Sequence, residues 1–366
     1  MKSKPPILFI LHCPPPVHGS SIVGQYIKNS TLINTTFCCR YINILASRKI
    51  NETGKISFIK AFRFLGIWFR LFFEIIKKKP DICYLALTAT GAAFYKDVML
   101  VFLLRAFQIK RVYHLHNKGV SKNQSSRIKV ALYKYVFKDA DIILLSKYLY
   151  NDIQSFVSES HVSICPNGID FFDSKPKLFS SHKPVKILFL SNLIETKGVF
   201  VLLEACSILQ NKGFDFECDF IGSEGDLNIS QFDEKVNQLH LTDHVNYLGP
   251  KYGKEKQKML SEADIFTFPT FYSNECFPLV LLEAMSEGLP VVSTYEGGIP
   301  DIVEENVTGY LVPQRNIGDL ALKLEALITN KDLRIKMGNA GRLKFEAEFK
   351  LSIFEHKIVE ILSKII

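Results

Sequence analysis

Short apolar runs alternate with longer amphipathic stretches along the whole chain. The run Ile7–Leu11 is wholly apolar, and Val185–Leu190 holds a single lysine. Apolar runs of about four to eight residues are typical of strands buried on both faces of a parallel sheet. Further strands are expected at residues 81–87, 111–117, 139–146, 162–170, 216–222, 245–249, 263–269 and 291–293. The pattern therefore predicts an α/β protein.

Helices are expected between these strands. The loop after Ile7–Leu11 leads into a helix that opens near Ser20 or Ser21, and either hydroxyl is suited to cap it. Other helices are expected at residues 98–107, 320–329, 332–345 and 351–366. Strands that alternate with helices predict doubly wound units, in which a sheet is covered on both faces.

Two stretches repeat one another across the chain and predict two such units. Asp139-Ala-Asp141 opens one apolar strand, and Glu262-Ala-Asp264 opens another. The echo also argues against a metal site at Asp139 and Asp141, because an acid before a strand is a common structural start. A chain of 366 residues fits two domains. We expect domains at 1–172 and 185–345, joined by the polar segment 171–184.

The stretch 56–79 has a wide apolar face and a narrow polar stripe. The stripe consists of Lys60, Arg63, Arg70, Glu74 and Lys77. Two interpretations fit a helix of this kind. It packs on the sheet with its stripe in water, or it lies in a membrane interface with Trp68 and several phenylalanines in lipid and its cations at the head groups.

Charge divides the chain unevenly. The net charge is +8, but residues 1–170 hold 24 Lys and Arg against 9 Asp and Glu, while the remainder holds 21 against 28. A basic first half favours an anionic partner: membrane lipid, a phosphate-bearing acceptor or nucleic acid. The acidic second half and the lack of a basic–aromatic RNA motif argue against nucleic acid. An anionic membrane surface bound by the first domain is the expected partner.

The eight cysteines form no C-x2-C pair, and only Cys38 and Cys39 are adjacent. This is neither a zinc pattern nor a disulfide framework, so reduced cysteines of a cytoplasmic protein are expected. The apolar run Ile7–Leu11 is too short for the core of a signal peptide. No run approaches the ~20 apolar residues of a membrane span.

The stretch 271–288 carries the strongest chemical signal. It follows the expected strand 263–269, Pro278 fits the first turn of a helix, and Gly288 ends that helix. Free N–H groups and the helix dipole make such a helix start an anion site. Glu275 in the loop would repel phosphate but suits a neutral, hydroxyl-rich group attached to it. A sugar joined to phosphate is the simplest candidate.

Glu275 and Glu283, separated by seven residues, resemble the E-x7-E motif of the retaining glycosyltransferases of the GT-B fold, family 4. Further features match in order: Pro166-Asn-Gly-Ile-Asp170, Lys197-Gly198, Gly297-Gly298-Ile-Pro-Asp301 and Asn306-Val-Thr-Gly309. The likeness is specific over the C-terminal half and loose over the N-terminal half. It implies two doubly wound Rossmann-like domains facing across a cleft. It also implies that helix 349–366 packs back on the first domain, which binds the acceptor, while the second binds a nucleotide-sugar.

The donor's parts each need a different contact. The Glu283 carboxylate suits the two ribose hydroxyls, unless it is a solvated helix residue. Lys197 suits the diphosphate, Glu275 the sugar hydroxyls, and the region of Leu248 and Gly249 the base. The helix start adds Pro278 and the amides of Phe277, Leu279 and Val280.

Other contacts are carried over from the resemblance. The family's glycine-rich first loop keeps only Gly19 here, and Asn192 stands where the family usually has an arginine. Gly297 and Gly298 form either a loop near the phosphate or acceptor, or a simple turn. Alternation puts His114 and His116 on one face of a strand. The resemblance gives His116, nearer the strand's carboxyl end, a place at the anomeric carbon; the alternative is a packed or capping histidine.

The resemblance implies a metal-independent, retaining hexosyltransferase with no cofactor besides its nucleotide-sugar, a UDP-sugar in our interpretation. The expected acceptor is a lipid-linked or saccharide glycan of bacterial surface polysaccharide, O-antigen or capsule, at the inner face of the plasma membrane. Two other classes stay open. A nucleotide-sugar epimerase shares the fold but generally needs acid–base pairs around the sugar, and only one such histidine and one glutamate are found. The other is a non-enzymatic binding module.

Overall fold

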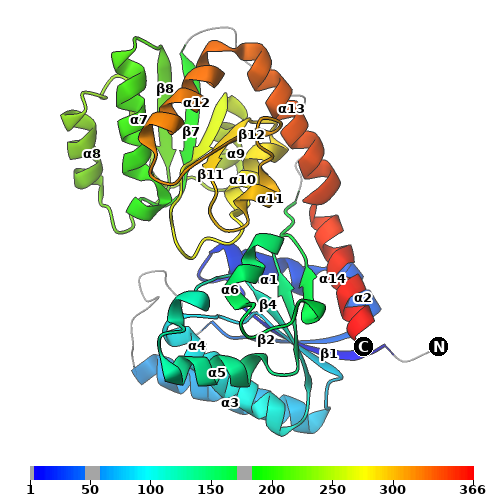
Figure 1. The fold of residues 1–366 in the computed structure, drawn as a ribbon. Coiled ribbons are helices and arrows are strands. Elements are labelled where there is room, and N and C mark those ends of the chain that lie inside the picture. The colour runs from blue at the N-terminus through cyan, green and yellow to red at the C-terminus, as the bar shows by residue number, and fades with distance from the viewer. Residues whose placement is uncertain (1–3, 46–57, 171–183) are drawn as a thin grey trace. The chain divides into compact units, whose positions relative to one another are not determined.

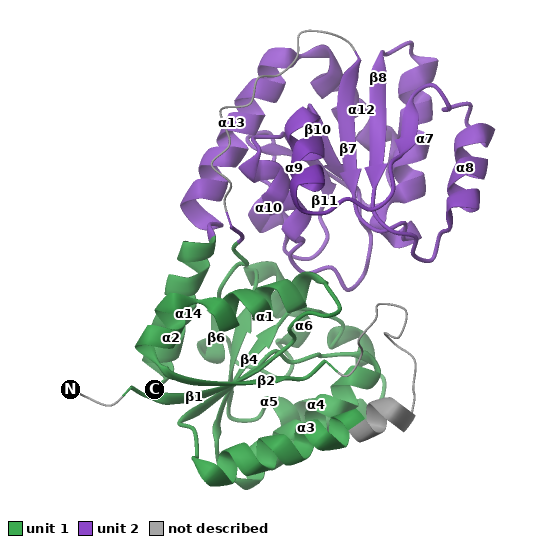
Figure 2. Ribbon diagram, turned by 180° about the vertical axis from the view of Figure 1, so that it is seen from behind, with its two compact units in different colours: residues 1–168, 351–366 green, residues 169–350 purple. Residues whose placement is uncertain are grey.

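The computed structural model describes residues 4–45, 58–170 and 184–366 (Figure 1). It divides into two compact units (Figure 2). Unit 1 holds Met1–Gly168 together with Leu351–Ile366, and unit 2 holds Ile169–Lys350. The first unit is therefore discontinuous in sequence. Residues 171–183 of the expected linker lie outside the described residues.

Unit 1 contains a six-stranded parallel sheet in the order β2-β1-β3-β4-β5-β6. The strands are β1 (Pro6–Leu11), β2 (Cys38–Asn43), β3 (Ile82–Leu85), β4 (Lys110–Leu115), β5 (Ala140–Leu144) and β6 (Val162–Ile164). The central strands are buried except at a few positions near their starts, as their apolar sequences predict. The edge strand β2 was not predicted, because its arginine, tyrosine and asparagine break the apolar pattern.

Helices cover both faces of this sheet. One layer holds α3, α4 and α5, and the other holds α1, α2 and α14 (Figure 1). The helices are α1 (Gly19–Asn29), α2 (Thr31–Thr36), α3 (Phe58–Lys77), α4 (Gly91–Ala106), α5 (Arg127–Phe137), α6 (Tyr150–Ile153) and α14 (Leu351–Ile365). The unit is therefore doubly wound.

The start of α1 differs from the expected serine cap. His18 is the N-cap, and its Nδ1 accepts a hydrogen bond from the Ser21 N–H at 3.3 Å. The Ser21 hydroxyl oxygen accepts one in return from the His18 N–H at 2.9 Å. Ser21 thus occupies the N3 position of a capping box whose N-cap is His18. The cap prediction was wrong because an imidazole takes the role that we assigned to a hydroxyl.

Unit 2 repeats the plan with a parallel sheet in the order β12-β11-β10-β7-β8-β9. Its strands are β7 (Val185–Leu190), β8 (Phe216–Ile221), β9 (Val245–Tyr247), β10 (Ile265–Phe268), β11 (Val291–Thr294) and β12 (Gly309–Val312). Its helices are α7 (Val199–Asn211), α8 (Ile229–Gln238), α9 (Gly253–Glu262), α10 (Leu279–Ser286), α11 (Ile299–Ile302), α12 (Ile317–Thr329) and α13 (Lys331–Glu348). In both units the loops after the strands therefore gather at one edge, where open α/β sheets bind ligands.

The cysteines and the lengths of the helices can be compared with the expectations from the sequence. All eight cysteines are free thiols. Within the described ranges, every helix is too short or too polar to cross a bilayer.

Candidate active site

Gly198 fixes the position of Lys197 in unit 2. The chain leaves β7, forms a short 3-10 turn at Glu195–Lys197 and enters α7 through Gly198, whose φ is 92°. A Cβ on Gly198 would lie 2.3 Å from the carbonyl oxygen of Pro269. Only glycine fits both the left-handed backbone and this approach. Gly198 thus allows the turn that carries Lys197 to pack closely against the loop that follows β10.

Glu275 lies in that loop and pairs with Lys197. Its N–H donates to the Tyr272 carbonyl at 2.8 Å, which closes a tight turn. The largely buried Glu275 carboxylate accepts a hydrogen bond from the Lys197 ammonium. The same ammonium lies 4.5 Å from the centroid of the Tyr272 ring. The structure thus brings together two predicted site residues from different loops, and Lys197 keeps further N–H donors.

The two glycines after β11 support the Glu275 loop. Gly297 has a φ of 57°, and a Cβ there would lie 2.3 Å from the Glu275 carbonyl oxygen. The Gly298 N–H donates to the Cys276 carbonyl at 2.6 Å, and the Gly297 N–H donates to Oε1 of Glu296 at 3.0 Å. Both amides are thus engaged within unit 2. In the described contacts the glycines act by letting two loops lie close together.

The start of α10 is one residue later than predicted. Pro278 is the N-cap, with a ψ of 119°, and the helix begins at Leu279. Proline supplies no side-chain cap, so the first-turn N–H groups of Leu279 and Val280 point out of the helix start. Phe277 is buried, and its ring lies 5.8 Å from that of Phe349. Its side chain therefore serves packing.

Glu283 lies in the second turn of α10. Its Oε1 accepts a hydrogen bond from the ammonium of Lys256 in α9 at 2.7 Å. Its other oxygen, Oε2, is buried and has no hydrogen-bond partner among the described residues. A buried carboxylate oxygen without a partner is costly. Glu283 is thus held by one cation and retains one acceptor for a hydroxyl; nothing in the sequence pointed to Lys256.

Asn192 and Leu248 follow β7 and β9, the strands on either side of β8 in unit 2. Oδ1 of Asn192 accepts from the Ser223 N–H at 3.3 Å. A Cβ on Gly222 would lie 1.9 Å from the Ser191 carbonyl oxygen, so the ends of β7 and β8 touch. The Leu248 N–H donates to the Phe220 carbonyl at 2.9 Å. These contacts bring the predicted residues to the same edge of the sheet as Lys197.

His116 belongs to unit 1, just beyond the end of β4. Its ring centroid lies 4.2 Å from that of His114, as the alternation predicted. His114 is fully buried, and its Nδ1 shares a hydrogen bond with the Tyr84 hydroxyl. Burial, and secondarily the charge of His18, lower the pKa of His116 to about 4. His116 is therefore a neutral imidazole near pH 7.

Sequence reasoning missed two other histidines near this edge. His12 follows β1, and its ring centroid lies 6.1 Å from that of His18. Burial lowers the pKa of His12 well below its ordinary value, with smaller effects from Lys96, His18 and His116. Gly19, the predicted phosphate glycine, begins α1 and has nothing within 4 Å of its Cβ position. Packing therefore does not require glycine there, in contrast to Gly24, whose Cβ would lie 1.9 Å from the His12 carbonyl oxygen.

Residues 170–344, nearly all of unit 2, match the family model described as glycosyl transferases group 1. The match covers just under half of the chain, and it agrees with the broad glycosyltransferase family that the E-x7-E motif predicted.

Two curated relatives are similar over most of this chain. The amylovoran biosynthesis glycosyltransferase AmsK of Erwinia amylovora is 32% identical over 72% of this chain and 66% of its own length. The putative colanic acid biosynthesis glycosyltransferase WcaL of Escherichia coli K12 is 28% identical over 68% of this chain and 62% of its own length. The chain thus spans somewhat less than two thirds of the relatives that it matches.

Solved structures agree on the fold. Sucrose-phosphate synthase from Thermosynechococcus elongatus has a TM-score of 0.75 at 18% identity and covers 99% of both chains. Anabaena HepE in complex with UDP has a TM-score of 0.76 at 17% identity, over 98% of this chain and 100% of its own. The two doubly wound units are therefore those of a GT-B glycosyltransferase fold, as the sequence predicted.

Proposed function

We propose that this protein is a retaining glycosyltransferase that moves a sugar from a nucleotide-diphosphate sugar to a lipid-linked or saccharide acceptor in bacterial surface polysaccharide synthesis. The bacterial relatives AmsK and WcaL are named for amylovoran and colanic acid biosynthesis, and CapM of Staphylococcus aureus, 28% identical over 60% of this chain, is named for capsular polysaccharide biosynthesis. HepE was solved with UDP and glucose, which supports a UDP-sugar donor. The relatives' names disfavour the epimerase.

The observation that carries this proposal is the pairing of Lys197 with Glu275 beside the start of α10. A nucleotide-sugar presents a diphosphate joined directly to a neutral sugar. Lys197 and the uncapped N–H groups of α10 suit the diphosphate, because both favour negative charge. The Glu275 carboxylate suits the sugar hydroxyls next to it, and the unpaired Oε2 of Glu283 suits a ribose hydroxyl.

The proposed chemistry follows from these groups. The bond between the anomeric carbon and the diphosphate oxygen breaks, and the acceptor oxygen forms a bond on the same face of the sugar. The acceptor's proton passes to the departing diphosphate oxygen. Lys197 and the α10 amides stabilise the charge that grows on the diphosphate. His116, as a neutral imidazole, suits hydrogen bonding at the sugar. A divalent ion has little charge left to neutralise.

Arg315 is a cation suited to replace the arginine that Asn192 displaces. It follows β12, and its guanidinium carbon lies 4.3 Å from the centroid of the Phe271 ring. The Phe271 N–H donates at 2.8 Å to the carbonyl of Thr196, the neighbour of Lys197. Arg315 therefore stacks next to the proposed diphosphate site. Arg315→Gln is expected to raise the donor KM about tenfold; an unchanged KM would exclude it from this role.

A donor screen tests the proposal directly. The protein is incubated with radiolabelled nucleotide sugars and a bacterial lipid extract. Label in the lipid fraction supports a lipid-linked acceptor, interconversion of the free donor indicates an epimerase, and no turnover indicates a binding module. NMR of the product's anomeric proton, with excess EDTA present, then tests retention and metal independence. An inverted anomer, or activity lost with EDTA and restored by magnesium, contradicts the mechanism.

We further propose that unit 1 binds the inner face of the plasma membrane. Leu65, Phe69, Phe73 and Ile76 are exposed at spacings that place them on one face of α3. Tyr95, Met99 and Phe102 are exposed on one face of α4, which packs against α3 (Figure 1). The exposed cations Lys77, Lys78 and Lys79 follow at the end of α3. An apolar face beside cations suits an anionic membrane surface.

A further inference from the structure

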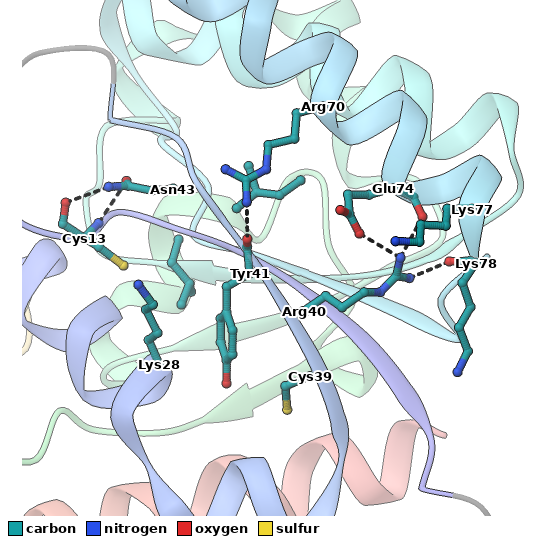
Figure 3. A pocket seen from close by; sticks show the side chains of 12 residues that line it. Cys13, Lys28, Cys39, Arg40, Tyr41, Asn43, Arg70, Glu74, Lys77 and Lys78 are labelled. Carbon is teal, nitrogen blue, oxygen red and sulfur yellow. Dashed lines mark hydrogen bonds and ion pairs between the residues drawn. The ribbon is translucent and has the colours of Figure 1, made fainter.

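A groove of about 570 Å³ runs along the edge strand β2 between α1 and α3 (Figure 3). One end is lined by Cys13 and Asn43, at the carboxyl ends of β1 and β2. The other is lined by Lys77 and Lys78, at the end of α3. The volume is that of an ordinary small-molecule site. The groove lies in unit 1 alone, and the proposed donor residues of unit 2 do not line it.

The lining of the groove is strongly basic. One carboxylate, that of Glu74, stands against five cationic side chains. These are Lys28, Arg40, Arg70, Lys77 and Lys78. Such a concentration of one sign of charge in a hollow attracts an anion with more than one negative charge.

Arg40 and Glu74 neutralise one another and hold the groove together. Nη1 of Arg40 donates to the Glu74 carboxylate at 2.9 Å and to the Glu74 carbonyl at 2.7 Å. Its other terminal nitrogen donates to the Lys78 carbonyl. Arg40 therefore fastens the end of α3 to β2, and its substitution would damage the fold.

The remaining four cations have no carboxylate partner among the described residues. Arg70 makes one long hydrogen bond, from Nη2 to the Tyr41 carbonyl at 3.4 Å (Figure 3). Lys28 reaches the groove from α1, and Lys77 and Lys78 from the end of α3. Four positive charges without anions surround one hollow, which suits a phosphate or diphosphate group.

The position of the groove indicates what kind of phosphate compound it binds. Arg70 and Lys77 line it from one flank of α3, while Phe69, Phe73 and Ile76 form the exposed apolar flank of the same helix. A phosphate in the groove would thus lie beside the face that we assign to lipid. This suits a phosphate that is itself joined to a lipid chain.

The other end of the groove leads to the carboxyl edge of the sheet. Cys13 and Asn43 hold one another there, with hydrogen bonds of 3.1 and 3.0 Å between the Asn43 amide and the Cys13 backbone. Cys13 directly follows His12, whose surroundings include His116. A saccharide attached to the bound phosphate would therefore extend toward the histidines that we place at the sugar.

We propose that this groove binds the phosphate groups of the lipid-linked acceptor, a saccharide joined to a lipid through a diphosphate. The four unpaired cations hold the diphosphate, the lipid follows the apolar flank of α3, and the saccharide points to the strand ends. The assignment rests on the proposed function for the identity of the acceptor.

Lysine footprinting tests the groove directly. The full chain is treated with an amine-acylating reagent, and the rate at each lysine is read by mass spectrometry with and without farnesyl diphosphate, a short lipid diphosphate. Acylation of Lys28 should slow about tenfold, because its ammonium would hold a phosphate oxygen. Lys122 and Lys134, exposed lysines of unit 1 outside the groove, are the internal controls and should not change.

Variants and other ligands make the result decisive. Arg70→Gln should abolish the protection of Lys28, Arg70→Lys should restore part of it, and Lys122→Gln should leave it intact. Protection that survives Arg70→Gln, or equal protection at Lys122, overturns the proposal. Phosphatidylglycerol vesicles or inorganic pyrophosphate that protect Lys28 as well as farnesyl diphosphate would assign the groove to phospholipid or to free phosphate instead, and would also overturn it.

Failure of this inference is distinguishable from failure of the proposed function. If no donor supports transfer while Lys28 is still protected, the groove stands and the enzymatic assignment falls. If transfer to lipid continues in Arg70→Gln with an unchanged acceptor KM, the enzyme stands and the groove is not its acceptor site.

Discussion

The ammonium of Lys197 and the carboxylate of Glu275 meet directly, although 78 positions separate them in the chain. Two glycines permit this meeting, Gly198 against Pro269 and Gly297 against Glu275. A cation and an anion in one small site match the opposite demands of a diphosphate and the sugar attached to it. The pair is therefore the centre of the proposed donor site.

Glu275→Gln is expected to lower kcat about a hundredfold. Glutamine keeps an oxygen for Lys197 but loses the charge that orients the sugar and opposes positive charge near the anomeric carbon. Steady-state kinetics with the donor identified by the screen measures the change. Glu262→Gln, at an exposed residue of α9, is the control and should leave kcat within twofold. Full activity of Glu275→Gln would remove Glu275 from the site.

Glu283→Ala is expected to raise the donor KM about tenfold while kcat changes little. A ribose contact acts equally in the ground state and the transition state, so its loss weakens binding without slowing the chemical step. Titration of the nucleoside diphosphate into the variant should show the same loss. A fall in kcat at unchanged KM would instead place Glu283 at the reacting sugar.

Gly297→Ala is expected to destabilise the protein by about 2–3 kcal/mol, because a Cβ would meet the Glu275 carbonyl in a left-handed backbone. Gly213→Ala provides a matched control. Gly213 also has a positive φ, of 77°, but nothing lies within 4 Å of its Cβ position, so a cost near 1 kcal/mol is expected. Urea unfolding measures both, and equal costs would show that the close approach is unimportant.

Stability is expected to fall as the pH drops from about 6.5 toward 4. Burial lowers the pKa of His116 to about 4 and also lowers those of His12 and His114. The unfolded chain therefore binds more protons in this interval, so stability rises with pH there, by up to about 1.4 kcal/mol per pH unit for each histidine.

Urea unfolding at pH 7 and pH 5 measures this dependence. His116→Gln should lose less stability than the parent between the two values, because one depressed pKa is removed. His18, which influences the pKa of His116, remains in both proteins. An identical pH dependence in the variant would show that His116 titrates normally.

Neutralising Lys77, Lys78 and Lys79 with glutamine is expected to weaken binding to anionic vesicles on the order of a hundredfold, at roughly 1 kcal/mol per cation. Binding of the parent should also fall as salt rises. Phe73→Ser tests the apolar flank of α3, with Ile128→Ser on α5 as a similarly exposed control. Vesicle binding that stays the same after all these changes would rule out α3 as the helix that binds the membrane.

The sequence predicted the strands that carry the fold but not every neighbour of the site. β7 was predicted at Val185–Leu190 and occurs there, because a strand buried on both faces must be nearly continuous in apolar residues. The strand β2 was missed because it lies at the edge of the sheet, where burial is incomplete. Polar residues such as Arg40 and Asn43 are tolerated there, and they break the apolar pattern.

The missed contacts depend on the order of strands in each sheet. His12 follows β1 and His116 follows β4, and the two lie near one another because β1 and β4 are on either side of β3 in the sheet. Lys256 in α9 pairs with Glu283 in α10, and these helices come directly before and after β10 in the sequence. No local pattern in the sequence records such a meeting, whereas the E-x7-E spacing is local and could be read directly.

The assignment of α14 to unit 1 has a consequence for synthesis on the ribosome. Leu351–Ile366 emerges only after all of unit 2 has been made. Until then α2 lacks the helix that packs on it, and Phe354 is not yet available to lie beside His114. The unit that is translated first is thus completed last, so a stalled or prematurely ended chain could fold unit 2 while unit 1 still exposed apolar surface to chaperones and proteases.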